Sequence, residues 1–103
     1  MNANGVATAV RNAKHEKGLG NEAFSRRERA QAVTHYTEAI EYLHDAAAQQ
    51  PTDEEKSNIQ GTMAVCFANR AAAWLLPGEG QDPQKALDDA SAAVEHDAGY
   101  AKG

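Results

Sequence analysis

Lys17 and Asn21 are the residues of this sequence whose types and spacing favour a defined chemistry. They lie four positions apart among helix-forming residues, so both side chains fall on one helical face. An ammonium and a primary amide one turn apart can donate hydrogen bonds to the same group of oxygens. A carboxylate-rich ligand needs such converging donors, because desolvating its charge is otherwise unfavourable. The pair indicates a carboxylate site, although each residue alone is more often an ordinary solvated side chain.

The other residues that commonly carry chemistry form no catalytic or metal-binding pattern. Cys66 is the single cysteine and has no base that the sequence can place beside it, so we expect a buried, unreactive thiol. The histidines show neither the HExxH motif nor a paired-ligand spacing, and we expect no metal and no other cofactor. They are His15, His35, His44 and His96. The sequence therefore predicts that the protein is not an enzyme.

The composition favours one small domain of closely packed helices. The chain has 103 residues, of which 42% are hydrophobic, enough for one core of modest size. Only 6% are aromatic and alanine dominates the apolar residues, so the buried volume must come from helices that approach closely. We therefore expect an all-α fold of stacked antiparallel helices rather than a sandwich or a barrel.

Charge and hydropathy argue against two classes of partner. The formal net charge of −5 is unfavourable for nucleic-acid binding, which requires a basic face. No run approaches the ~20 apolar residues of a membrane span, and no charged and apolar leader opens the chain. The single cysteine cannot form an internal disulfide. We expect a soluble protein of the cytoplasm, with the nucleus as a second location, that binds neither nucleic acid nor membrane.

Local signals place the first two helices. Residues 1–12 are small and polar with weak periodicity, and we expect a flexible segment there. The first helix should cover residues 13–25 and lead into a charged turn at 25–29 whose arginines are solvated. The second helix should continue through residue 48, because the residue before Pro51 is disfavoured in helical geometry.

Capping signals place the next two helices. Thr52 and Glu55 have the spacing of a capping box, which starts a third helix that should end near Leu76. Asp82 followed by Pro83 predicts the start of a fourth helix. Its buried face is expected to consist of Ala86, Leu87, Ala90, Ala93 and Val94.

A pattern of small and aromatic residues occurs twice along the chain. Gly20 belongs to the first copy, and because glycine within a helix costs ~1 kcal/mol relative to alanine, it indicates close approach of a partner helix. The first copy is Leu19, Gly20, Ala23, Ala32, Tyr36 and Ala39, and the second is Ala71, Trp74, Ala86, Ala90 and Ala93. This pattern resembles the tetratricopeptide repeat (TPR), a helix-turn-helix unit of ~34 residues.

The resemblance implies a short right-handed superhelix of stacked repeats. The first repeat would cover residues 13–50, the second 53–98, and a truncated third would begin with a fifth helix at 100–103. Because the copies are farther apart than the ~34-residue period, helices two and three should be extended beyond the usual stack. Ending at Gly103 would leave the outer face of helices three and four uncovered, so we also expect self-association.

Four residues are similar to those of the carboxylate-clamp class of these domains, in which the groove grips a free C-terminus ending in Glu-Glu-Val-Asp. The resemblance assigns carboxylate binding to Lys17, Asn21, Asn69 and Lys102. The apolar floor of the groove would be Phe24, Ala72 and Leu75. An arginine expected about one turn after Lys102 is not part of the sequence.

The resemblance implies a protein-protein interaction adaptor. The leading hypothesis is a co-chaperone domain that binds the C-terminal peptide of the 70- or 90-kDa heat-shock chaperones. The alternative is a TPR scaffold or assembly module whose groove takes an internal peptide or another subunit. Free-acid and amidated forms of one peptide would distinguish these hypotheses.

Overall fold

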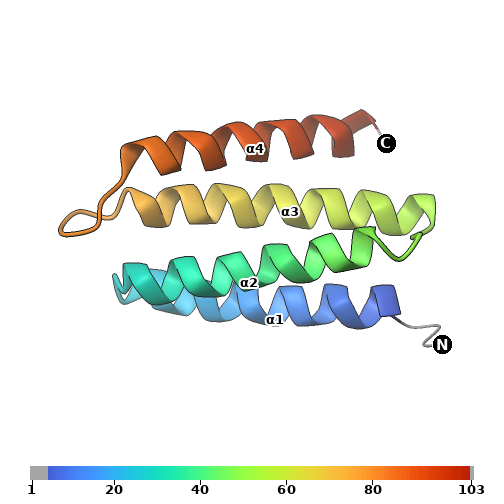
Figure 1. Ribbon diagram of the computed structural model, residues 1–103, viewed down its shortest axis with the longest axis horizontal. Coiled ribbons are helices and arrows are strands. Elements are labelled where there is room, and N and C mark those ends of the chain that lie inside the picture. Colours follow the sequence, from blue (N-terminus) through green and yellow to red (C-terminus); the bar gives the residue numbers. More distant parts are fainter. Residues whose placement is uncertain (1–4, 103) are drawn as a thin grey trace.

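The computed structural model consists of four helices joined by two short turns and one longer loop (Figure 1). The helices are α1 (Gly5–Ser25), α2 (Arg29–Ala47), α3 (Asp53–Trp74) and α4 (Pro83–Lys102). The structure describes residues 5–102, with side chains for 5–97, and within this range it contains only helices and irregular connections. The predicted all-α class is confirmed. In the same range, no helix has both the length and the hydropathy needed to cross a membrane.

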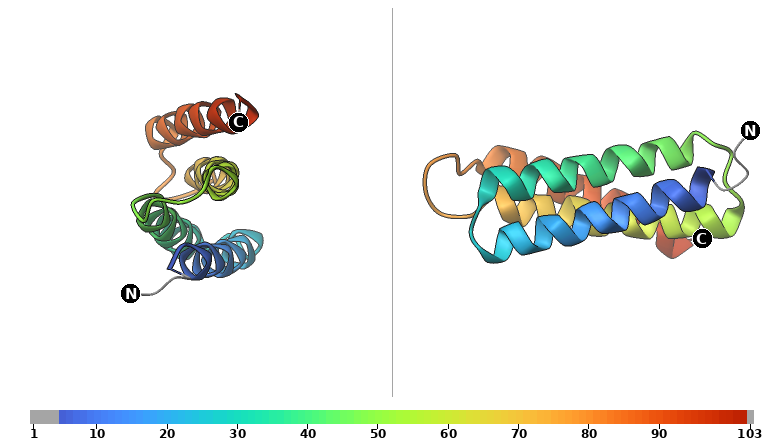
Figure 2. Two further views of the ribbon diagram at one scale, coloured as in Figure 1. Left: turned by 90° about the vertical axis from the view of Figure 1, so that its right-hand side faces the viewer. Right: turned by 90° about the horizontal axis from the view of Figure 1, so that it is seen from below.

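The helices run antiparallel and form an open row instead of a closed bundle. α1 packs along α2, α2 along α3 and α3 along α4, with a shorter contact between α1 and α3. Among the described residues, α4 contacts no helix other than α3. Viewed end-on, α1 and α4 lie at opposite ends of the row (Figure 2). α3 is therefore the helix that joins the α1–α2 hairpin to α4.

The N-terminal part of the chain belongs to the folded domain. α1 begins at Gly5, and its first turns bury Ala9 and Val10, which are 7% and 8% exposed. The prediction of a flexible segment over residues 1–12 is therefore wrong for residues 5–12, while residues 1–4 lie outside the described range. The sequence signal was weak because these side chains are small, although residues 6, 9, 10 and 13 have helical spacing.

The longer α1 also changes the expected outline of the molecule. The helices contain 21, 19, 22 and 20 residues in chain order, so no pair is much longer than its neighbours. Gly5 lies against the side chain of Gln49, so α1 starts level with the end of α2. The extension expected for helices two and three is not confined to them, because α1 and α4 contain 21 and 20 residues (Figure 1).

The starts of α3 and α4 that the capping signals predicted are confirmed. Thr52 Oγ1 accepts from the Glu55 amide at 3.1 Å, and a Glu55 carboxylate oxygen accepts from the Thr52 amide at 2.8 Å. Asp82 caps α4 by accepting from the Lys85 amide at 3.0 Å. Arg29 departs from the solvated turn that the sequence predicted. Its guanidinium is partly buried and donates to the carbonyl oxygens of Ala73 and Glu79, which ties the first turn to the loop after α3.

Two apolar clusters form the core, and α1, α2 and α3 supply both. The larger cluster contains Leu43, Ile59 and Cys66, which are 0%, 2% and 0% exposed. The smaller cluster surrounds Tyr36, which is 1% exposed and shares the cluster with Ala73 of α3. None of the described side chains of α4 belongs to either cluster. α4 adds to the buried apolar surface through Ala86, which is 4% exposed.

Polar contacts attach α4 to this core. Arg70 Nε and Nη2 donate to the two carboxylate oxygens of Asp89, each at 2.7 Å, and Nη1 donates to Thr37 Oγ1 of α2 at 3.0 Å. The side chains of Arg70 and Asp89 are 20% and 8% exposed, so this bidentate pair is largely removed from water. The His96 ring also stacks on Phe67, with ring centroids 5.4 Å apart.

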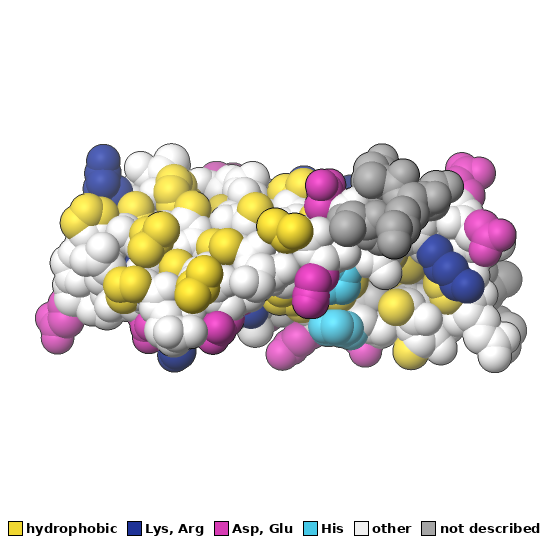
Figure 3. Space-filling model, turned by 90° about the horizontal axis from the view of Figure 1, so that it is seen from above, with side chains coloured by type: hydrophobic (Ala, Val, Ile, Leu, Met, Phe, Trp, Pro, Cys, Tyr) yellow, Lys and Arg dark blue, Asp and Glu magenta, His cyan; other side chains and the backbone are white. Residues whose placement is uncertain are grey.

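The face of α4 that the sequence predicted to be buried is largely exposed. Ala86 is buried at 4%, but Leu87 and Val94 are 60% and 69% exposed, and Ala90 is exposed too. Figure 3 shows apolar side chains gathered on this outer surface of the molecule. The prediction failed because Asp89 turns toward α3 to reach Arg70, which rotates the stripe of Leu87 and Val94 away from the core.

The C-terminal end of α4 also differs from the prediction. The helix was expected to end at residues 97–99, and a fifth helix was expected at 100–103. α4 instead continues through Gly99 to Lys102. Lys102 therefore belongs to α4 and not to a further helix, and its side chain lies outside the described residues.

Candidate peptide-binding site

Asn21 of α1 and Asn69 of α3 meet at a small cavity between the two helices. Asn69 Nδ2 donates to Asn21 Oδ1 at 3.2 Å, and the Tyr36 hydroxyl donates to the same oxygen at 2.6 Å. The cavity has a volume of about 210 Å³, and its remaining lining residues are Phe24 and Ala72. The structure thus brings together four residues that the sequence assigned to the carboxylate site or to the groove floor.

The two bonds to Asn21 Oδ1 fix the orientation of its amide group. Because the oxygen accepts both bonds, the Nδ2 hydrogens point the other way and have no partner among the described residues. Burial raises the pKa of the Tyr36 phenol, with the nearby Cys66 adding to the effect, so the hydroxyl keeps its proton and donates. Asn21 is therefore a donor with a defined direction on an exposed helix face.

Gly20 makes this arrangement possible. A Cβ atom at residue 20 would lie 2.6 Å from Cε1 of the Tyr36 ring, a distance that requires the ring to move. The ring can therefore lie against the backbone of α1, which places its hydroxyl beside Asn21. The predicted close approach at Gly20 is confirmed. By contrast, a Cβ atom at Gly18 would meet nothing within 4 Å.

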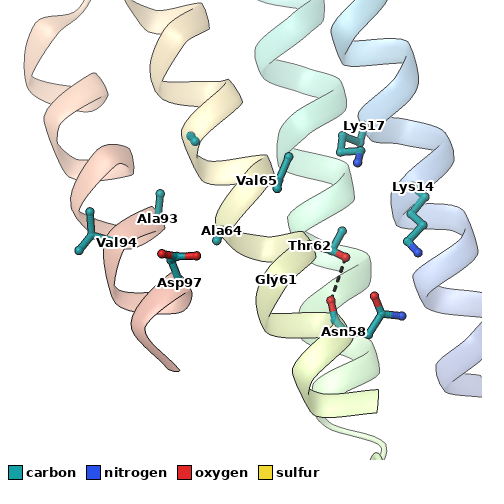
Figure 4. Close-up of a pocket in the computed structure, with 11 residues that line it drawn as sticks. Lys14, Lys17, Asn58, Gly61, Thr62, Ala64, Val65, Ala93, Val94 and Asp97 are labelled. Carbon is teal, nitrogen blue, oxygen red and sulfur yellow. Dashed lines mark hydrogen bonds between the residues drawn. The ribbon is translucent and has the colours of Figure 1, made fainter. Parts of the chain in front are cut away.

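A larger cavity adjoins the asparagine pair along α3. Its volume is about 700 Å³. Lys14 and Lys17 of α1 border one side, and Ala93, Val94 and Asp97 of α4 border the other (Figure 4). Its floor on α3 is formed mainly by small residues: Asn58, Gly61, Thr62, Ala64, Val65 and Ala68. Lys17, which lines this cavity, lies one turn before Asn21 on α1.

The positive charges along α1 are available to a ligand. Ion pairs in the described part of the chain join Arg26 to Glu22, His35 to Glu16 and Arg70 to Asp89, so neither Lys14 nor Lys17 takes part in one. Burial raises the pKa of the Cys66 thiol to about 11, although the Lys17 and Arg70 cations oppose this shift. Cys66 is fully buried and stays a neutral part of the core.

Among the predicted site residues whose side chains the structure describes, Leu75 lies apart from the rest. Leu75 is 49% exposed at the C-terminal cap of α3 and lines neither cavity. The resemblance assigned it to the groove floor, but α3 ends at Trp74 and Leu75 is the C-terminal cap. Lys102 was expected on a fifth helix and instead continues α4.

Sequence reasoning missed two residues of the site. Tyr36 was assigned to the core alone, although a buried tyrosine hydroxyl generally requires a hydrogen-bond partner, and that requirement was the available signal. Lys14 was passed over because it precedes the recognised motif. Its position three residues before Lys17 could have indicated that both lysines border the same groove.

The described residues include no cluster of metal-ligating side chains. Among them, no three His, Cys, Asp or Glu side chains gather closely enough to hold a metal ion. Comparison of the chain with protein-family models, curated proteins and solved structures gave no match. The interpretation of the site therefore depends on its geometry.

Proposed function

We propose that this chain is a TPR-type co-chaperone domain of the cytoplasm or nucleus that binds the C-terminal Glu-Glu-Val-Asp carboxylates of a heat-shock chaperone of the 70- or 90-kDa class. The observation that carries the proposal is the pairing of Asn21 and Asn69 at one oxygen, beside Lys17. Two helices from separate hairpins thus supply amide donors to one small cavity. The open row of helices, each in contact with its neighbours, is also the arrangement expected of a repeat protein.

The terminal aspartate offers two carboxylates close together, which suit this set of donors. The free Nδ2 hydrogens of Asn21 and the remaining hydrogen of Asn69 can donate to one carboxylate, and Lys17 supplies positive charge one turn away. Each charge-assisted hydrogen bond contributes ~1.5–3 kcal/mol where water is excluded and ~0–1 kcal/mol for an exposed pair. Because Asn21 is exposed in the free protein, affinity depends on how well the peptide itself covers the site.

The neighbouring apolar surface suits the valine of the same peptide. Phe24 and Ala72 line the cavity that holds the asparagines. An apolar side chain of the peptide that contacts them would be removed from water, which is favourable by ~25 cal/mol for each Å² of buried apolar surface. The site thus combines a polar subsite with an adjacent apolar one.

Calorimetric titration with a Glu-Glu-Val-Asp peptide tests the proposal. The free acid should bind at least about tenfold more tightly than the C-terminal amide, because amidation removes one of the two charges that the donors meet. Asn69→Ala should weaken binding of the free acid, whereas Asn12→Ala, an exposed amide of α1 that lines no cavity described above, should not. Equal binding of the acid and the amide would exclude a clamp for the chain terminus.

The alternative function is a TPR scaffold that binds an internal peptide or another subunit. The observation in its favour is the apolar character of the larger cavity, whose floor and α4 side include Ala64, Val65, Ala68 and Ala93. Such a ligand would not need a free carboxylate. Tight binding of an amidated peptide that Asn69→Ala leaves unchanged would support this alternative over the clamp.

A further inference from the structure

The groove beside α1 extends well beyond the asparagine pair. The cavity bordered by Lys17 shares Lys14 and Asn58 with a third cavity of about 380 Å³, which lies along the first turns of α1 and includes Val6 and Val10. At the opposite end, Lys17 of the larger cavity and Asn21 of the asparagine cavity are one turn apart on α1. The three cavities therefore lie in succession along α1, and together they are called the α1 groove.

The length of this groove exceeds the needs of a four-residue peptide. From Val6 to Phe24, α1 rises by ~27 Å at ~1.5 Å per residue. An extended peptide advances by ~3.3 Å per residue, so about eight residues fit along the groove. The part beyond Lys14 exists because α1 starts at Gly5, and it is therefore a property of the first two turns of this helix.

The α1 side of the groove carries three positive charges. Arg11, Lys14 and Lys17 occur at three-residue intervals, and each lines at least one of these cavities. Arg11 and Lys14 are exposed, and neither takes part in an ion pair within the described part of the chain. This positive edge belongs to a chain whose formal net charge is −5, so it is a local departure from the charge of the whole molecule.

The acidic residues of the groove lie on other helices. Glu55 of α3 lines the third cavity, but its carboxylate accepts from the Thr52 amide in the capping box. Asp97 lies on the α4 side of the cavity of about 700 Å³, across α3 from Lys14 and Lys17 (Figure 4). At physiological salt the Debye length is ~8 Å, so a ligand that follows α1 is influenced mainly by the nearby cations.

We propose that the groove takes an extended acidic peptide of about eight residues, whose upstream carboxylates face Arg11 and Lys14 while an apolar side chain contacts Val6 and Val10. The positive charges on the α1 side of the groove favour acidic residues, and the length of the groove favours a peptide of about eight residues. The placement of its C-terminus at Asn21 and Asn69 rests on the proposed function. The upstream contacts stand separately, since they involve different residues.

Titration with four peptides tests the proposal. The first is the Glu-Glu-Val-Asp tetrapeptide, and the second is an octapeptide with two additional upstream glutamates. The third has glutamines at those two positions, and the fourth is the acidic octapeptide as an amide. The acidic octapeptide should bind about three- to tenfold more tightly than the glutamine octapeptide, with the difference declining as salt rises. Arg11→Gln with Lys14→Gln should remove this difference, and Arg11→Gln alone should reduce it while leaving tetrapeptide binding unchanged. Arg26→Gln with Lys56→Gln is the control, since both residues are exposed, line none of these cavities and carry the same total charge.

The outcomes separate this inference from the proposed function. Equal binding of the acidic and glutamine octapeptides, or a difference that survives the Arg11 and Lys14 substitutions, would overturn the upstream contacts. Failure of the tetrapeptide, together with equal binding of the octapeptide acid and amide, would contradict the carboxylate clamp. Even then, the upstream contacts would be supported if the amidated acidic octapeptide bound more tightly than the glutamine octapeptide and the Arg11 and Lys14 substitutions removed this preference.

Discussion

α4 and the three helices before it are held in the fold by different forces. α1, α2 and α3 share two apolar clusters around Leu43 and Tyr36, whereas none of the described side chains of α4 belongs to either. α4 buries Ala86 and contacts α3 through the Arg70–Asp89 pair and the His96–Phe67 stack. Apolar packing tolerates small shifts, but a buried charge that loses its partner is strongly unfavourable. The comparison indicates that α4 is the helix most sensitive to single polar substitutions, while the groove wall formed by α1 and α3 is the stable part.

Among the substitutions considered, Asp89→Ala should destabilise α4 most strongly relative to the other three helices. It leaves the guanidinium of Arg70 without its counter-charge in a site that is only 20% exposed, and breaking such a pair costs ~3–5 kcal/mol. Hydrogen exchange should show loss of protection in α4 with much smaller changes in α1 and α2. Asp88→Ala is the matched control, because Asp88 is exposed and accepts only from Gln84. Unchanged protection of α4 in Asp89→Ala would contradict this account.

Leu43→Ala and Leu87→Ala compare the same substitution in the two regions. Leu43 is fully buried, and its truncation should lower the free energy of unfolding by ~2–5 kcal/mol through lost burial and a cavity. Leu87 is 60% exposed, so its truncation should change stability by less than ~0.5 kcal/mol. Urea unfolding monitored by circular dichroism measures both. A comparable loss in the two variants would show that α4 packs more tightly than the structure indicates.

Alkaline pH should weaken the three-helix core through Cys66. Burial raises the pKa of this thiol from 9.0 to about 11, so the folded protein keeps a proton that the unfolded chain releases. This contribution to stability is complete below pH 9 and declines as the pH rises toward 11. Urea midpoints at pH 8 and pH 10.5 should therefore differ more for the native protein than for Cys66→Ala. Equal differences would mean that Cys66 does not contribute.

Leu87→Ser with Val94→Ser should have the smallest effect on stability and a specific effect on association. Both side chains form the exposed apolar stripe of α4, through which we propose that copies of the chain self-associate. Sedimentation over a range of concentrations should show association of the native protein and a monomer for the double variant. Ala30→Ser with Ala48→Ser, at exposed sites on the first hairpin, is the control. A native protein that stays monomeric at the highest concentration would contradict the prediction.

The sequence predicted the features that depend on neighbouring residues. The capping box at Thr52 and the cap at Asp82 are confirmed, because each follows from local geometry. It failed where the answer depends on contacts between helices. The apolar residues of α4 did not show which side faces α3, since Arg70, distant in sequence, decides this by binding Asp89.

For the candidate site too, only the features that depend on local spacing could be predicted from the sequence. The spacing of Lys17 and Asn21 placed both on the groove side of α1, but it could not show that Asn21 accepts from Tyr36 and Asn69 through one oxygen. That detail depends on the distance between α1 and α3 in the folded protein. Leu75 was expected on the groove floor, which required α3 to continue beyond Trp74, but the helix ends at that residue.

The central claim is that Asn21 and Asn69 bind the carboxylates of a chain terminus, and the side-chain amide NMR signals of these two residues test it most directly. Titration with the free-acid Glu-Glu-Val-Asp peptide should shift both pairs of signals, and Tyr36→Phe, which removes the hydroxyl that orients Asn21, should reduce the shift at Asn21. The amidated peptide should produce much smaller shifts at the same concentration. Equal shifts with the acid and the amide, or shifts confined to other residues, would contradict the account.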